Sequence, residues 1–475
     1  MTTSTPPAVD RAARYRTRAD AFYVRHDGGV WLRNNAGSFS IRGAGAYELV
    51  GSLFANLDGE RTLDEVCAGL PDGARDSVLR LVGTLCRNGF VKEVRYPAEA
   101  APAWMRELYP AHLTFLDHHA DRPVTRMTRV RSRRVVCVGD GLALRSLVGA
   151  LGEFGIARLV VLTTGTGAAG IADVTARAVA ADPRLTWRTV VTGEHLDLDA
   201  LTGHAELIGA EHVLLAVDHD RPDRLADLQH RLAAAGAEVG VLGRCGDFVV
   251  AAPPPPVAPG GGLRWCWDCV RRSVVGTAAG DPAGLPPAVV PATLAALHLA
   301  QHLFTRLAEV PLDGAGLITS VEPMAPVVRT HAGRRHAACE RHPGPPAEPV
   351  SVSAGDGVVR PDVPASEDPA ELVAASDRIV AVTTAWTDPV AGPLLALGEG
   401  DGDQLPLSVS TCRMADPAPA VGAPPVRDLV CRAVSPREAR NQVVLVALEW
   451  AATRVAGPRG GLPRGHVLAA GWTPA

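Results

Sequence analysis

The chain has 475 residues, of which 47% are hydrophobic and 21% are charged, so it is long and apolar enough for two or three domains and is not globally disordered. Its formal net charge of −4 gives no bulk attraction to nucleic acid or to a membrane surface. There is no uncharged apolar run of about 18 to 20 residues and no apolar signal region at the start, so we expect a cytosolic, cytoplasmic protein. In that compartment the nine cysteines are expected to be free thiols or metal ligands.

The N-terminal part predicts a small domain over residues 19–96, after a polar tail at 1–18. Asp27-Gly28-Gly29 separates two extended runs, and Asp-Gly favours a tight hairpin. Thr62 and Glu65 have the spacing of a capping box, and Asn88-Gly89 suits a helix C-terminus. The expected strands are 22–25, 30–33 and 38–41, and the expected helices are 43–56, 63–66 and 75–87. Three small strands and three helices predict a winged-helix domain.

A linker is expected over residues 97–130, followed by an α/β domain over 131–345. Buried apolar runs alternate with helical stretches, which predicts a doubly wound, mostly parallel sheet. The expected strands are 135–138, 159–162, 213–217 and 239–242, and the clearest helices are 221–235 and 291–308. The remaining residues, 346–475, are rich in proline, glycine and aspartate. We expect a less regular α+β region there, with a strand at 379–383 and a helix at 437–455.

Two short cysteine motifs provide the sharpest signal. Cys266 and Cys269 form a CxxC pair, and Cys339 and His342 form a CxxH pair. A CxxC turn places two thiolates at the separation that tetrahedral zinc needs, and the CxxH pair completes a Cys3His structural site. We therefore predict one structural Zn²⁺ ion, with His336 as an alternative fourth ligand. Unrelated free thiols and a redox CxxC are the competing interpretations.

A glycine turn follows the first strand of the predicted α/β domain. Gly139 and Gly141 have the spacing that opens a phosphate-binding G-x-G-x-x-G, but Leu144 stands where the third glycine belongs. A tight turn without nucleotide is favoured. Asp218 ends another strand, where doubly wound folds place ligand groups, and its simpler role is to cap the helix near Arg221.

The predicted winged helix raises the question of DNA binding, which its charges do not favour. The 75–87 helix has no dense basic face, because Asp72 and Asp76 accompany its arginines. A short edge strand beside an amphipathic helix suits capture of an extended peptide by strand addition. The predicted peptide-binding residues are Ser38, Phe39, Ser40 and Ile41 on the strand, and Arg75, Leu79, Arg80 and Val82 on the helix.

The order of these regions resembles a known family. Residues 19–96 look like a PqqD-like RiPP recognition element, which binds leader peptides of ribosomally made natural products, through the glycine hairpin and the segments 56–63 and 85–91. Residues 131–345 are similar to the ThiF-like, ubiquitin-activating-enzyme-like fold, through the strand and turn at 135–141, the segments 216–218 and 243–249, and the split zinc pairs. Together they resemble the ocin-ThiF-like partners of YcaO cyclodehydratases, which make azoline heterocycles.

The resemblance also has departures that bear on catalysis. Adenylating members of the fold use an arginine shortly after the second strand and a lysine, but residues 163–172 contain no arginine and Lys92, the sole lysine, lies outside the fold. Without cations on the ATP phosphates, little would stabilise charge in adenyl transfer. Gly139, Gly141 and Asp218 are therefore interpreted as a vestigial nucleotide site, with ATP bound by a separate YcaO subunit.

These features imply a non-catalytic scaffold that presents a precursor peptide to a YcaO cyclodehydratase in antibiotic or bacteriocin biosynthesis, with no catalytic residues of its own. The implied partners are the leader peptide, the cyclodehydratase and a second copy of the chain in a homodimer. Residues 435–450 resemble the first helix of a YcaO domain and suit docking, although an ordinary surface helix is equally favoured. An ATP-dependent enzyme that activates a peptide carboxyl is the alternative, and a winged-helix regulator with a metal-sensing domain is the third possibility.

Overall fold

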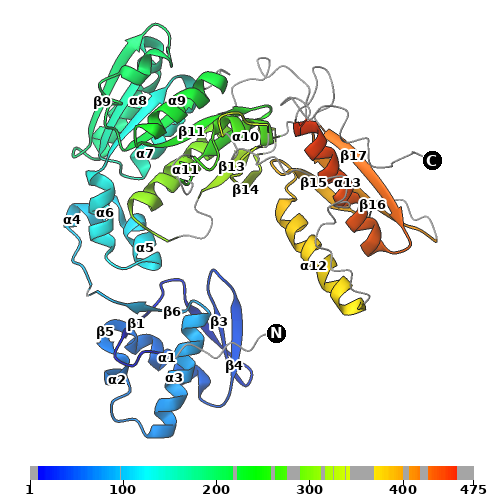
Figure 1. Ribbon diagram of the computed structural model, residues 1–475. Helices are drawn as coiled ribbons and strands as arrows, with labels where there is room; N and C mark the ends of the chain where they lie inside the picture. The colour runs from blue at the N-terminus through cyan, green and yellow to red at the C-terminus, as the bar shows by residue number, and fades with distance from the viewer. Residues whose placement is uncertain are drawn as a thin grey trace. The chain divides into compact units, whose positions relative to one another are not determined.

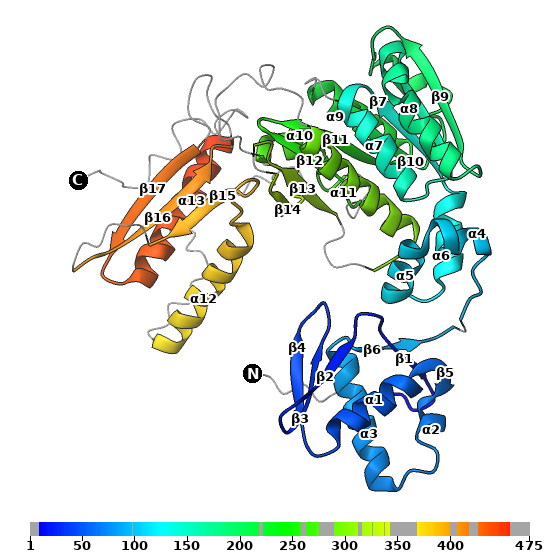
Figure 2. The ribbon, with the colours of Figure 1, turned by 180° about the vertical axis from the view of Figure 1, so that it is seen from behind.

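The computed structural model describes residues 9–96, 98–217, 222–257, 263–274, 289–311, 316–324, 326–336, 338–342, 368–399, 406–417 and 426–456. The chain divides into two compact units, which Figures 1 and 2 show from opposite sides. The first comprises residues 1–133 with 154–157 and 303–315, and the second comprises 134–153, 158–302 and 316–475. Among the described residues, no helix is both long and apolar enough to cross a membrane.

The first unit begins with two small antiparallel sheets around one core. The sheets have the strand orders β5-β1-β6 and β2-β3-β4. Their strands are β1 (Arg14–Thr17), β2 (Phe22–His26), β3 (Gly29–Arg33), β4 (Ser38–Arg42), β5 (Asp58–Thr62) and β6 (Val91–Val94). The helices are α1 (Ala46–Asn56), α2 (Leu63–Val66) and α3 (Asp72–Arg87). The predicted hairpin and the capping box of Thr62 and Glu65 are both present. The assignment as a winged helix stays a prediction.

Two expectations for this unit were wrong. The polar tail at 1–18 contains strand β1, which pairs with both β5 and β6 because Tyr15 reaches the core, where it is 5% exposed. The segment expected as a linker contains three helices, and prolines stand at the first turn of two of them, where the missing N–H costs nothing. These helices are α4 (Ala103–Leu108), α5 (Pro110–His119) and α6 (Pro123–Ser132).

The second unit is built on an eight-stranded sheet of order β14-β13-β12-β11-β10-β7-β8-β9. The strands β11, β10, β7, β8 and β9 are parallel, and β12, β13 and β14 extend the sheet in antiparallel fashion. The strands are β7 (Arg134–Gly139), β8 (Arg158–Thr164), β9 (Thr186–Gly193), β10 (His212–Val217), β11 (Glu238–Cys245), β12 (Phe248–Ala252), β13 (Leu317–Val321) and β14 (Val328–Ala332). The prediction of a mostly parallel α/β sheet is confirmed.

Helices lie against both faces of this sheet. They are α7 (Gly141–Glu153), α8 (Gly165–Ala181), α9 (Pro222–Ala234), α10 (Trp267–Ser273) and α11 (Val289–Leu307), with a 3-10 helix at Ala200–Gly203. On β11, Gly240 packs against Leu299 of α11 and Gly243 packs against Trp267 of α10. Gly240 and Gly243 are three residues apart, and residues separated by an odd number of positions face opposite sides of a strand. Helices α10 and α11 therefore cover opposite faces of the sheet.

The C-terminal part of the second unit forms a small α+β layer. Its sheet has the order β15-β16-β17, and helix α13 lies across one face (Figure 1). The elements are α12 (Pro369–Trp386), β15 (Leu394–Gly398), β16 (Ser408–Ala415), β17 (Val426–Ala433) and α13 (Pro436–Ala456). The predicted helix at 437–455 is confirmed, whereas the predicted strand at 379–383 is wrong, because these residues belong to α12. The side chain of Asp368 caps that helix by accepting from the N–H of Ala370 at 2.9 Å.

Candidate functional site

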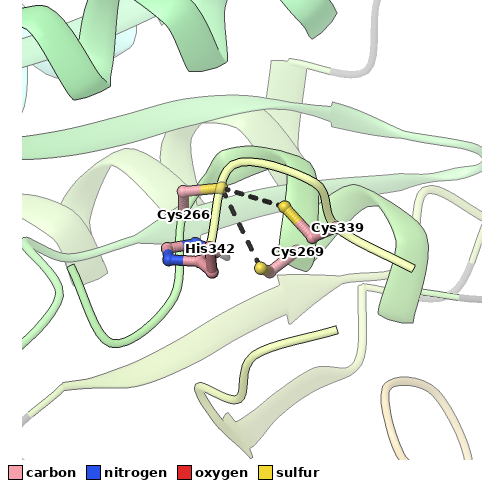
Figure 3. A group of neighbouring side chains, drawn as sticks. All are labelled: Cys266, Cys269, Cys339 and His342. Carbon is pink, nitrogen blue, oxygen red and sulfur yellow. Dashed lines mark hydrogen bonds between the residues drawn. The ribbon is translucent and has the colours of Figure 1, made fainter. Parts of the chain in front are cut away.

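The two predicted ligand pairs come together in the second unit. Cys266 is the N-cap residue of α10 and Cys269 lies in its first turn, while Cys339 and His342 follow strand β14. Cys266 Sγ lies 3.9 Å from Cys269 Sγ and 3.8 Å from Cys339 Sγ, as Figure 3 shows. One ligand atom from each of the four residues lies within 4.8 Å of the others. The four side chains therefore converge on one point.

The chemistry of this cluster fits a metal ion. All three cysteines are fully buried as free thiols, and His342 is 9% exposed. His342 Nε2 is buried and has no hydrogen-bond partner in the described part of the chain, which suits a metal ligand. Tetrahedral zinc with Zn–S bonds of about 2.3 Å would separate its sulfur ligands by about 3.8 Å, close to the spacing of these thiols. The cluster could therefore hold a metal ion such as zinc.

Hydrogen bonds and burial shift the pKa values of Cys266, Cys269 and His342 in different directions. Hydrogen bonds from Cys266 and Cys339 lower the pKa of the Cys269 thiol, whereas the bonds that Cys266 makes to its neighbours raise its own pKa. Burial lowers the pKa of His342, so its imidazole is neutral and can offer a lone pair. His336, the alternative fourth ligand, is not in the cluster; its Nδ1 accepts the N–H of Ala338 at 3.2 Å.

Two residues that no sequence motif singled out, Gln229 and Asp268, support the cluster. Gln229 is fully buried on α9, and its Oε1 accepts the N–H of Trp267 at 2.7 Å while its Nε2 donates to Val239 C=O at 3.3 Å. Asp268, between the two ligand cysteines, accepts hydrogen bonds from the guanidinium groups of Arg271 and Arg272 at 2.9 and 2.7 Å. These contacts fix the start of α10. The sequence around Gln229 does not predict this contact, because a glutamine on an amphipathic helix usually faces solvent.

The glycine turn after β7 has a structural explanation. A Cβ at Gly139 would lie 1.8 Å from the carbonyl oxygen of Ala216, so only glycine lets β7 approach β10 here. Gly141 has a φ of 61°, which favours glycine in the turn. Leu144 is fully buried in the core. Asp218, the third predicted member of the nucleotide site, lies outside the described residues.

Strand β4 carries the predicted peptide-binding edge. Asn34 N–H donates to Gly37 C=O at 2.9 Å and Gly43 N–H donates to Gly28 C=O at 2.8 Å, one at each end of the β3–β4 ladder. Hydrogen-bonded pairs alternate along an antiparallel ladder, so the backbone groups that pair with β3 are those of Phe39 and Ile41. The backbone groups of Ser38, Ser40 and Arg42 therefore turn to the other edge, with which no described strand pairs.

The side chains of β4 alternate in the same way. Ser38, Ser40 and Arg42 are exposed, whereas Phe39 and Ile41 are half-buried and pack against the core of the first unit. Phe39 also meets Phe90 edge to face, with ring centroids 5.4 Å apart. The strand is thus held on its inner face while its outer face and one edge stay exposed.

Helix α3 carries the other four predicted residues. Leu79 is half-buried, Arg80 is exposed and donates to Ser77 Oγ at 3.1 Å, and Arg75 lies 3.9 Å from Asp72. The expectation that Val82 is available to a peptide is wrong, because Val82 is fully buried in the same core as Val78. One turn of α3 therefore presents a single apolar side chain between two arginines.

A further polar relay joins three elements of the second unit. Ser320 Oγ of β13 lies 2.7 Å from His331 Nε2 of β14, and His331 Nδ1 lies 2.7 Å from Asp388 Oδ2 in the loop after α12. The groups have the order of a Ser-His-Asp triad. Ser320 and His331 are only 1% and 3% exposed, so the relay serves to fasten the C-terminal layer to the large sheet. No short sequence motif predicts this relay, because its three residues are far apart in the chain.

These observations define a doubly wound α/β protein with an antiparallel extension and a buried Cys3His cluster. Its fold is similar to that of E. coli MccB, with a TM-score of 0.51 and 14% identity over 69% of this chain and 96% of that chain. The Microcin C7 biosynthetic enzyme MccB in complex with N-formylated MccA matches with a TM-score of 0.50 and 13% identity over 69% and 99% of the two chains. E. coli MccB with ATP matches with a TM-score of 0.50 and 12% identity over 69% and 98%.

At these identities the likeness is one of fold, and it confirms the expected α/β architecture as one shared with MccB. No family model matches the sequence, and no curated protein matches it.

Proposed function

We propose that the protein is a leader-peptide-binding scaffold, which presents a ribosomally made precursor peptide to a YcaO cyclodehydratase for azoline formation. The observation that carries this proposal is the open edge of β4, where the backbone groups of Ser38, Ser40 and Arg42 are free of a described strand partner. The fold supports it, since the structure of the similar MccB has been solved in complex with N-formylated MccA.

Strand addition at β4 would supply affinity through the backbone. An incoming strand exchanges N–H and C=O hydrogen bonds with an edge regardless of its side chains, and specificity then comes from flanking pockets. Leu79 of α3 offers an apolar contact, and the exposed Arg80 and Arg42 add positive charge. These groups would favour a leader in which apolar and acidic side chains alternate.

The proposal assigns the second unit a scaffolding role. The glycine turn at Gly139 is explained by the approach of β7 to β10, and Leu144 fills a core position instead of a phosphate loop. Zinc held by the Cys3His cluster would tie the start of α10 to the segment after β14 and stabilise this unit without taking part in a reaction. Lys92 pairs with Asp117 and Asp121 in the first unit, so it is engaged elsewhere.

Binding to the full-length chain tests the proposal. Short precursor peptides encoded beside this gene are labelled, and their affinity is measured by fluorescence anisotropy. We expect a Kd on the order of 1 µM for the cognate precursor. The Ser40→Pro variant removes an outward N–H without touching the β3 ladder, so its Kd should rise at least about tenfold, whereas the Ser40→Ala variant should bind normally. Equal binding by both variants, or binding of duplex DNA in place of every precursor, would contradict the proposal.

The alternative function, adenylation of a peptide carboxyl, is favoured by one observation. The shared fold is that of MccB, which has been crystallised with ATP. If this alternative holds, the chain consumes ATP in the presence of a precursor and without a YcaO partner. Reconstitution of the chain, precursor and YcaO protein separates the two, because the scaffold proposal requires heterocycles only when all three are present.

A further inference from the structure

Strand β17 forms one edge of the C-terminal sheet. It pairs with β16 over its whole length, and no described strand pairs with its other edge. Leu429 and Cys431 turn towards α13 and pack against the small core there. Figures 1 and 2 show β17 as an extended outer strand of this sheet. An unpaired edge of this length is a ready template for a further strand.

The side chains on the opposite face of β17 follow a symmetrical pattern. Every second residue from Val426 reads Val426, Asp428, Val430, Arg432 and, just beyond the strand, Val434. Val430 is 51% exposed, Val434 is 79% exposed, and the Asp428 side chain is 71% exposed. The row therefore places apolar residues at its centre and its ends, with one acidic and one basic residue between them.

We propose that β17 pairs with β17 of a second copy of this chain in an antiparallel, two-fold symmetric interface. With Val430 opposite Val430 of the partner copy, Asp428 lies opposite the arginine at position 432 of that copy, and Val426 lies opposite its valine at position 434. The symmetry repeats each pair, which gives two ion pairs and three valine pairs on one face. The two sheets become one continuous antiparallel sheet.

The charges specify this register and orientation. A shift that centres the pairing on residue 429 or 431 places Asp428 opposite a valine and leaves Asp428 and Arg432 without an opposite charge across the interface. Parallel pairing would place Asp428 beside the same residue of the partner, where like charges repel. On the other face, Leu429 lies opposite Cys431 of the partner copy, and Arg427, whose guanidinium stacks over the Trp450 ring of its own chain, lies opposite the alanine at position 433.

The interface is separate from the proposed peptide edge, because β4 belongs to the first unit and β17 to the second. A dimer formed through β17 is therefore not implied by peptide binding at β4. A scaffold that pairs in this way would carry two peptide-binding edges per assembly, so it could present two precursors.

A charge swap on the full-length chain tests the inference by sedimentation velocity at about 1 to 100 µM. The wild type should be dimeric, and Asp428→Arg should raise the dimer dissociation constant at least about tenfold, because two attractive pairs become repulsive. Adding Arg432→Asp to that variant should restore the dimer. Arg413→Ala is the matched control, since it removes only the exposed contact of 3.8 Å between Arg413 and Asp428 within one chain. A monomeric wild type, or an Asp428→Arg variant that stays dimeric, overturns the proposal.

The register has a second readout that does not depend on charge. Position 430 lies opposite itself, so the Val430→Cys variant should form a disulfide-linked dimer on mild oxidation. Cys431 of the wild type lies opposite Leu429 and should not cross-link. Absence of the cross-link in a dimeric Val430→Cys variant would show that a different surface forms the dimer.

Discussion

His331 Nδ1 lies 2.7 Å from Asp388 Oδ2, and this hydrogen bond joins strand β14 to the loop that follows helix α12. The second oxygen of Asp388 accepts the N–H groups of Val390 and Ala391 at 2.9 and 3.0 Å. Because a carboxylate only accepts, His331 Nδ1 is the donor, and in the neutral ring Nε2 accepts from the hydroxyl of Ser320. One carboxylate thus organises its own loop and anchors the C-terminal layer.

Stability should depend on the ionisation of Asp388. Burial raises its pKa, but the hydrogen bonds from His331, Ala391 and Val390 outweigh burial and lower the pKa to about 2. A carboxyl whose pKa is lower in the folded state stabilises the fold above its unfolded pKa of about 4, and this contribution is lost as the pH falls towards 2. We expect Asp388→Asn to cost about 1 to 3 kcal/mol at pH 7 and progressively less below pH 4. Urea denaturation of both proteins across this range measures it, and a cost independent of pH would contradict the role of the charge.

The proposed zinc site predicts an effect of removing one thiol. If the cluster holds zinc, the Cys269→Ser variant should lose the ion, and the second unit should be destabilised by about 3 kcal/mol or more, a fall in Tm of about 10 °C. Elemental analysis and thermal denaturation provide the two measurements. Cys431→Ser, outside the cluster, is the control and should keep a wild-type metal content. Wild-type protein purified without chelator that contains no stoichiometric metal would exclude zinc at this cluster.

The chain alone should not activate a carboxyl with ATP. Residues 163–172 contain no arginine, and α8 begins at Gly165, so this segment supplies no cation for the phosphates. We expect no ATP–pyrophosphate exchange above background with any precursor that binds. Exchange that is abolished in the Asp218→Ala variant would establish the adenylating alternative.

Gly139 should matter for folding and not for nucleotide. Because a Cβ there would lie 1.8 Å from Ala216 C=O, Gly139→Ala should cost more than about 3 kcal/mol or prevent soluble expression. Gly165→Ala is a suitable control, since no atom lies within 4 Å of its Cβ position. Comparable unfolding midpoints for the two variants would show that β7 and β10 can separate at this point.

The sequence predicted the elements that local chemistry specifies. The continuous apolar run of β7 and the Asp27-Gly28 turn have only one reasonable structural interpretation. CxxC and CxxH likewise restrict the four ligands to one site, and they do converge. In the strand and the turn the residues that determine the outcome are neighbours in the chain, and in the cluster each of the two ligand pairs is formed by near neighbours.

Features that depend on distant contacts were missed. The β-branched run 379–383 suggests a strand, but the cap at Asp368 and packing against α13 make it helical. Strand β1 is too polar to be predicted from its own residues, and it forms because it pairs with a strand on each side. The burial of Val82 is a different case, because Val82 lies four residues after Val78 and three before Leu85, so the helical period itself places it on the buried face of α3.

Lys92 has a practical consequence for work on this protein. It is the sole lysine in the sequence, and its ammonium lies 3.7 Å from both Asp117 Oδ1 and Asp121 Oδ1. An amine-reactive ester at mildly acidic pH would find the Lys92 ammonium engaged by two carboxylates, whereas an α-amino group has an ordinary pKa of about 8 and is the preferred target. One dye or one biotin per molecule can therefore be attached without engineered cysteines, which leaves the thiol cluster untouched by the chemistry used to observe it.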